Sequence, residues 1–177
     1  ELTWAEVSSS SLLDVSSAEV YSNRTVNNVS GVSNWSDLTN TINSSSTGGW
    51  FLDFPGGTER NLGQATLLGE LLTFTSYLPS TDICAAEGTS RLYAVYYKTG
   101  TAYFRDVIGS DEIDDDLYER KRIVELGNGL AVSPNIHVGR EEGSKAFVQT
   151  STGDIKVIQE VNPNLPKSGV KGWREME

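Results

Sequence analysis

The chain has 177 residues, of which 37% are hydrophobic, and its formal net charge is -10. This length is enough for one globular domain with a core of its own. The negative charge argues against nucleic acid and against an anionic membrane as partners, because both attract basic patches, and no apolar run approaches the roughly 20 residues that cross a bilayer.

The amino-terminal segment, residues 1–49, differs in composition from the rest of the chain. It begins with Glu1 instead of Met and shows no signal sequence, so we expect a processed or excised chain. Ser, Asn and Thr abound in it, and their side chains favour turns over long regular elements. One short helix is expected over 35–42, because Asn34 and Asp37 have the spacing of a capping box. Apolar residues also recur there at helical spacing, namely Trp35, Leu38 and Ile42.

Four Asn-X-Ser/Thr sequons lie in this segment, at Asn23, Asn28, Asn34 and Asn43. In a secreted chain such sequons are candidate glycosylation sites. A segment so rich in Asn, Ser and Thr also creates sequons by chance, so both interpretations stay open.

From Trp50 onward the sequence consists of short apolar runs separated by tight turns. Strands are predicted at 50–54, 65–68, 71–77, 91–97, 102–105, 135–138, 146–149 and 155–158. Turns are predicted at Gly69-Glu70, 98–100 and 151–154. We therefore expect residues 50–160 to be consecutive antiparallel strands, which is the pattern of an all-β domain.

A weak internal repeat refines this fold prediction. Thr99-Gly100 and Thr152-Gly153 occupy corresponding turns at a spacing of 53 residues (99 to 152), each after an apolar strand. Hairpins that repeat at about 50 residues are typical of propeller blades, although a β-sandwich would also contain hairpins. About two blades are too few to close a ring, so the remaining blades would come from a missing amino-terminal part or from another chain.

Several motifs resemble the carboxyl-terminal region of PilY-type proteins, which are adhesins of the type IV pilus tip. The motifs are Gly49-Trp50-Phe51-Leu52-Asp53-Phe54, Glu59-Arg60, Pro79-Ser80-Thr81-Asp82-Ile83-Cys84, Gly88-Thr89-Ser90-Arg91-Leu92-Tyr93-Ala94-Val95 and Trp173-Arg174-Glu175. The resemblance spans residues 35–177, and Thr58 departs from it because the family has Gly before the Glu-Arg pair.

The resemblance implies a secreted bacterial protein with a quinoprotein-like propeller at its carboxyl end. Residues 50–177 would then be the propeller blades, and the protein would act in pilus biogenesis, surface attachment and twitching motility. It also implies an extracellular, pilus-associated location and minor pilins as partners. We expect no enzymatic activity, no catalytic residues and no cofactor other than calcium in this part of the protein.

Two alternatives stay open. A fragment of a quinoprotein-type dehydrogenase is the first, because Leu92–Tyr97 with Thr99-Gly100 resembles the blade repeat of those enzymes. Such an enzyme needs a catalytic base, a calcium site and a flat surface on which the quinone stacks, and a complete set of these is not evident in the sequence. A carbohydrate-binding module is the second, and it rests on tryptophans that could stack on sugars, namely Trp4, Trp35, Trp50 and Trp173.

The acidic run 111–116 contains the metal candidates Asp111, Asp114 and Asp116. Calcium prefers six to eight oxygen ligands, and closely spaced carboxylates can supply several of them. The run lacks the alternating ligands of the family's calcium loop, so a solvated loop balanced by the basic residues 120–122 is the alternative interpretation.

Cys84 is the single cysteine of the chain, so it cannot form a disulfide within residues 1–177. In a secreted protein it is a candidate for a disulfide to a cysteine elsewhere, with a buried unpaired thiol as the alternative. His137 is the single histidine, and no nucleophile motif accompanies it.

Two blades would leave at least one apolar face uncovered, so we expect the chain to associate with other strands. The apolar residues expected on such faces are Leu67, Leu71, Phe74, Tyr93, Val95, Phe147 and Val157.

Overall fold

The computed structural model describes residues 9–44, 47–82, 88–139 and 143–164. Within these ranges the chain forms fourteen strands, one α-helix and one short 3-10 helix at Ser9–Ser11. The prediction of an all-β fold with a short helix near the amino end is therefore confirmed. In the same ranges no helix is long and apolar enough to cross a membrane.

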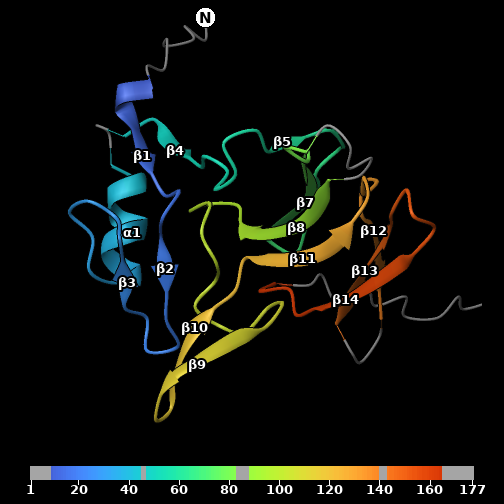
Figure 1. The fold of residues 1–177 in the computed structure, drawn as a ribbon. Helices are drawn as coiled ribbons and strands as arrows, with labels where there is room; N and C mark the ends of the chain where they lie inside the picture. The colour runs from blue at the N-terminus through green and yellow to red at the C-terminus, as the bar shows by residue number, and fades with distance from the viewer. Residues whose placement is uncertain (1–8, 45–46, 83–87, 140–142, 165–177) are drawn as a thin grey trace, which may run out of the picture.

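The amino-terminal region carries four short strands and the helix, and it lies at the left of Figure 1. Strand β1 pairs in parallel with β4, whereas β2 pairs antiparallel with β3. The elements are β1 (Leu12–Asp14), β2 (Glu19–Val20), β3 (Val26–Asn27), α1 (Trp35–Ile42) and β4 (Gly49–Phe51). The parallel pairing of β4 contradicts the expectation that residues 50–160 are antiparallel throughout, because β4 continues a ladder that starts in the amino-terminal segment.

Helix α1 begins and ends as the sequence predicts, because its cap is local chemistry. The Asn34 side-chain oxygen accepts from the backbone N–H of Ser36 (2.9 Å) and Asp37 (3.0 Å). The Asp37 carboxylate in turn accepts from the Asn34 side-chain nitrogen and the Ser33 hydroxyl, both at 2.7 Å. This reciprocal arrangement satisfies amide groups that have no partner inside the helix.

The sparse apolar residues of the amino-terminal region form a hydrophobic core of their own. Its buried members are Val15, Ala18, Val20, Val26, Val29 and Leu38, joined by Ala102 from much later in the chain. Trp35 extends this core through ring contacts with Tyr96 (5.6 Å), Tyr103 (5.4 Å) and Phe104 (5.3 Å). Valines spaced among Ser and Asn are thus enough to fold this region against the rest of the molecule.

The first large sheet has the strand order β11-β8-β7, with β5 and β6 both pairing to the far edge of β7. Its strands are β5 (Arg60–Asn61), β6 (Thr66–Leu68), β7 (Leu71–Leu78), β8 (Thr89–Tyr96) and β11 (Ile123–Asn128). Gly69 (φ 55°) and Glu70 (φ 71°) both adopt left-handed backbone between β6 and β7. Two such residues suit a tight hairpin turn, so the predicted hairpin is confirmed.

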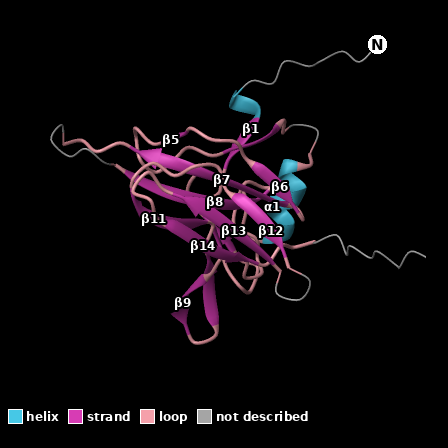
Figure 2. Cartoon of the chain, turned by 90° about the vertical axis from the view of Figure 1, so that its right-hand side faces the viewer, coloured by secondary structure: helices cyan, strands magenta, loops and turns pink. Residues whose placement is uncertain are grey.

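The predicted strand at 102–105 is wrong, although the turn before it is confirmed. The Thr101 carbonyl accepts from the Tyr96 N–H at 2.9 Å, and the chain then leaves the sheet. Tyr103 and Phe104 pack against Trp35 instead of pairing with β8. Strand β11 takes the place beside β8, after a hairpin of β9 (Ser110–Asp114) and β10 (Leu117–Arg120) that projects from the body in Figures 1 and 2.

The second sheet is an antiparallel meander of β12 (Asn135–Val138), β13 (Ser144–Gln149) and β14 (Ile155–Glu160). The Asp154 carbonyl accepts from the Thr150 N–H at 2.9 Å in the turn between β13 and β14, as predicted. One face of this sheet packs on the first sheet through a shared cluster whose buried residues are Leu92, Leu126, Ala131, Ala146 and Val148. The two sheets therefore form two layers, which Figure 1 shows side by side.

The opposite face of the first sheet is covered by the segment that follows β4. Phe54 contacts Phe74 (6.1 Å) and Tyr93 (5.2 Å), and these two rings stack on each other at 5.1 Å. Beside them lies the buried Glu59 carboxylate, which accepts from the Ser76 hydroxyl (2.5 Å), the Tyr93 hydroxyl (2.8 Å) and the Arg91 guanidinium (2.7 Å). Both faces of the first sheet are thus covered within the chain.

The expectation of widely exposed apolar faces is correct only in part. Four of the seven residues expected there are buried, namely Leu71, Phe74, Tyr93 and Val95. Leu67 and Val157 are 57% and 54% exposed. The strands of the described residues belong to separate open sheets and form no closed ring of blades.

Candidate binding cleft

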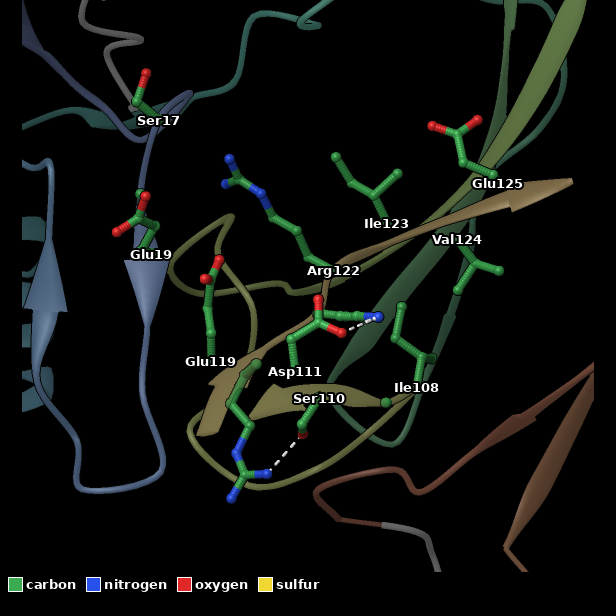
Figure 3. Close-up of a pocket in the computed structure, with 14 residues that line it drawn as sticks. Ser17, Glu19, Ile108, Ser110, Asp111, Glu119, Arg122, Ile123, Val124 and Glu125 are labelled. Atoms are coloured by element: carbon green, nitrogen blue, oxygen red, sulfur yellow. Dashed lines mark hydrogen bonds and ion pairs between the residues drawn. The ribbon is translucent and has the colours of Figure 1, made fainter. Parts of the chain in front are cut away.

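A cleft of about 670 Å³ lies between the amino-terminal region, the base of the β9–β10 hairpin and strand β11. Figure 3 shows its lining side chains. The lining comes from residues 17–19, 108–111 and 119–125, three segments far apart in sequence. Its volume falls in the range of cavities that take ligands.

One wall of the cleft is apolar. Its apolar residues are Ile108, Ile123 and Val124, and in Figure 3 the side chains of Ile123 and Val124 lie on opposite sides of β11. Val124 also packs against the core between the two sheets, and Ile123 packs against the aromatic core on the other face of β11. The strand that carries these two residues is therefore packed against a core on each of its faces.

Strand β11 runs along the cleft as the terminal strand of the first sheet. Its register pairs Ile123 with Tyr93 and Val124 with Leu92, and the Arg122 carbonyl accepts from the Ala94 N–H at 2.9 Å. Because alternate residues of an antiparallel strand point their backbone groups to opposite sides, Ile123 and Glu125 direct theirs away from β8. No strand of the described residues pairs with this outer edge.

Arg122 forms the back of the cleft. Its guanidinium donates to the backbone carbonyls of Val15 (2.8 Å) and Ser16, so it ties the amino-terminal region to the start of β11. Burial lowers the pKa of this guanidinium, while the charge of Glu119 acts in the opposite direction. The arginine is thus a structural clamp that sets the position of the two cleft walls.

The remaining wall is acidic. Asp111 is paired with the Lys121 ammonium at 2.5 Å, and Glu19 accepts from the Tyr21 hydroxyl at 2.8 Å. The Glu119 backbone pairs with Asp111 in the β9–β10 ladder, but its carboxylate forms no hydrogen bond or ion pair with the residues that the structure describes. Burial raises the pKa of Glu119, and the neighbouring charges of Glu19 and Asp111 raise it further, whereas the charges of Lys121 and Arg122 act in the opposite direction. The cleft therefore offers carboxylates that a cationic group could pair with.

The predicted calcium ligands are not brought together. Asp111 lines the cleft, Asp114 ends strand β9, and Asp116 lies in the hairpin turn with a φ of 61°. Among the described residues no three His, Cys, Asp or Glu side chains form a group that could hold a metal ion. The calcium prediction gains no support from this geometry and stays a prediction.

The other predicted sites have different surroundings. Asn23, Asn28 and Asn43 are exposed, whereas Asn34 is half-buried and its side chain caps α1. Glycosylation stays a prediction, with Asn34 the least available of the four. Cys84 lies outside the described residues. His137 is exposed on β12 and contacts the edge of the Phe147 ring at 5.1 Å.

The sequence analysis missed the cleft because its parts meet only in the fold. Glu19 and Glu119 come together through an isolated bridge between Tyr21 and Glu119. The apolar run at 123–126 was a signal for a strand, but residues 120–122 stood out only as counter-charges to the acidic run. Comparison with protein families, with curated proteins and with solved structures finds no match for the chain.

Proposed function

We propose that this chain is the carboxyl-terminal part of a secreted, PilY-like adhesin of the type IV pilus, acting in pilus biogenesis, surface attachment and twitching motility. Its part would be that of a binding and assembly module with no catalytic step of its own. The motifs quoted above suggest the family. The observation that carries the proposal is the face-to-face packing of two antiparallel sheets, the second of which leaves Ile155 and Val157 exposed on its outer face in the described residues.

The two sheets have the relation expected of neighbouring propeller blades. Each has a central strand, β8 or β13, that is followed by a turn with a glycine in left-handed backbone, Gly100 (φ 68°) or Gly153 (φ 91°). Each turn also holds a pair of threonine hydroxyls in contact, at 2.9 Å in the first and 2.7 Å in the second. This likeness supports the weak repeat and an arrangement of about two blades, because blades pack face to face around an axis.

The outer face of the second sheet is where a further blade would pack. Ile155 and Val157 lie there with exposures of 66% and 54%, and Phe147 pairs with Val157 across the ladder. Burying large apolar side chains contributes on the order of 1.5–3 kcal/mol each, so a matching surface would bind firmly. The missing amino-terminal part of the same propeller, or another chain at the pilus tip such as a minor pilin, would supply that surface.

The test uses the bacterium that carries the gene. Deleting the coding region for residues 9–164 should reduce twitching and surface attachment, and an epitope-tagged protein should be found at pilus tips by immunogold labelling. The double variant Ile155→Asp/Val157→Asp should lower co-purification with minor pilins, whereas Glu112→Gln on the projecting hairpin should not. Normal twitching and attachment after deletion, with the tagged protein remote from pili, would refute the proposal.

Dehydrogenase activity separates this proposal from the quinoprotein alternative. We expect no turnover of alcohols by the purified protein with added quinone cofactor and calcium, since the described residues hold no complete set of base, metal ligands and cofactor floor. Absorbance of a reducible dye measures the turnover. Activity above background that disappears on chelation of calcium would favour the dehydrogenase instead.

A further inference from the structure

We infer that the cleft beside β11 binds an extended segment of a protein partner, which adds to the free edge of β11 as a strand and places a Lys or Arg side chain against Glu19 and Glu119. This inference rests on the local geometry of the cleft and holds whether or not the protein is associated with a pilus. It names an interaction surface separate from the outer face of the second sheet.

The backbone of β11 supplies the first part of the argument. The outward N–H and C=O groups of Ile123 and Glu125 form a short edge that can continue the sheet by one strand. The bulge between Glu125 and Gly127 interrupts the ladder at the far end. An added strand would therefore pair over the stretch that lines the cleft and would end at the bulge.

The side chains of the cleft select the sequence of the added strand. Ile108 and Val124 stand at one end of the cleft, and Glu19 and Glu119 at the other, as Figure 3 shows. A strand lying along β11 would place apolar side chains against the first pair. At the end nearest Glu119 it would place a side chain that meets two carboxylates.

Charge complementarity with Glu19 and Glu119 favours a basic side chain at this position. Asp111 is already paired with Lys121, and Glu125 with Arg91 at 2.7 Å, so neither calls for a further cation. Among the described residues the Glu119 carboxylate forms no ion pair, although the charges of Lys121 and Arg122 lie near it, and the Glu19 carboxylate accepts only from the Tyr21 hydroxyl. A long ammonium or guanidinium group can reach between two such carboxylates, and the net charge of -10 favours the approach of a basic segment.

The experiment uses the full 177-residue chain, labelled with ¹⁵N, and synthetic peptides. The probe is a capped eight-residue peptide of alternating Val and Thr with one Lys near an end, and the matched probe has Glu in place of Lys. We expect amide shifts confined to residues 17–19, 108–111 and 119–125 with the Lys peptide. The Glu peptide should bind more weakly by up to about fivefold, which is the largest factor expected for one partly exposed ion pair.

Strand addition has a separate readout. N-methylation of the peptide at the residues whose N–H groups would face β11 should abolish binding, whereas methylation at the intervening residues should leave it intact. Glu119→Gln should weaken the binding of the Lys peptide by up to about fivefold. Glu112→Gln, on the same hairpin but outside the cleft, should leave that binding unchanged. Shifts elsewhere, equal binding of the Lys and Glu peptides, or insensitivity to the position of methylation would each overturn the inference.

Discussion

The two large sheets differ in how many of their faces the chain covers. The first sheet is enclosed, with Phe54 and Glu59 on one face and the second sheet on the other. The second sheet is covered on one face, and its outer face leaves Ile155 and Val157 more than half exposed. The enclosed sheet is therefore the stable centre of this chain, and the half-covered sheet is where association with another surface would have most effect.

Removing the buried carboxylate from the first sheet should have the largest effect on stability. Glu59→Ala would leave the Tyr93 and Ser76 hydroxyls and one side of the Arg91 guanidinium without their acceptor. Because breaking a buried charged pair from one side is strongly destabilising, the free energy of unfolding should fall by about 3–5 kcal/mol. Urea unfolding followed by circular dichroism measures it.

The matched control is Glu125→Ala, which removes the other carboxylate partner of the same arginine. The Glu125 side chain is 62% exposed, whereas that of Glu59 is 0% exposed. An exposed ion pair is worth about 1 kcal/mol or less, so this variant should unfold nearly as the wild type does. Equal decreases in the free energy of unfolding of the two variants would mean that the segment around Glu59 does not cover the sheet in solution.

Two valines of the second sheet compare its faces directly. Val148→Thr places a hydroxyl in the fully buried core between the sheets and should cost about 1–3 kcal/mol. Val157→Thr makes the same chemical change on the outer face and should change the unfolding free energy by no more than about 0.5 kcal/mol. A large loss in Val157→Thr at high protein concentration, absent on dilution, would show that the outer face is covered by a second copy.

The smallest expected effect on stability is a pH dependence that arises from Glu160, at the contact between the two sheets. Glu160 is fully buried there and accepts from the Thr73 hydroxyl at 3.1 Å. Burial raises the pKa of Glu160 above its ordinary value of 4.5, so the folded state holds this proton more tightly than the unfolded state. Stability from this group is therefore complete below the ordinary pKa and declines as the pH rises through the raised folded pKa.

Urea unfolding at a series of pH values, from acid to neutral, tests this decline. The difference in the free energy of unfolding between wild type and Glu160→Gln should change over that pH range, because Gln cannot ionise. Glu112→Gln, an exposed change on β9, should give the same profile as the wild type. Parallel profiles for wild type and Glu160→Gln would show that the contact between the sheets tolerates the charged carboxylate.

Local chemistry explains which elements could be predicted from the sequence. Helix α1 depends on the reciprocal contacts of Asn34 and Asp37, which are three residues apart, so its bounds could be read directly. The hairpin at Gly69-Glu70 is local in the same way. Strands β7, β8 and β12 to β14 follow from apolar runs between turn residues, and their packing agrees with that pattern.

The elements that the sequence analysis missed depend on contacts between distant residues. Tyr103 and Phe104 fit the composition of a strand, but Trp35 lies within ring contact of both and draws them away from β8. Strand β9 is mostly exposed and charged, and β10 is half-buried with two charged residues among its four, so no apolar alternation marks either strand. The carboxylates of the cleft meet through strand positions in different regions, and nothing in the sequence near Glu19 or Glu119 indicates the other.

The detour between β8 and β11 has a consequence for how the protein could be altered. Residues 97–122 leave the first sheet and rejoin it on the neighbouring strand, where Ile123 pairs with Tyr93. Lengthening a loop costs little free energy when its ends are already held together. The tip at Asp115 and Asp116 points away from the body in Figures 1 and 2. It is therefore the place where a fluorescent tag or a foreign epitope could be grafted, and where insertions would be tolerated during evolution.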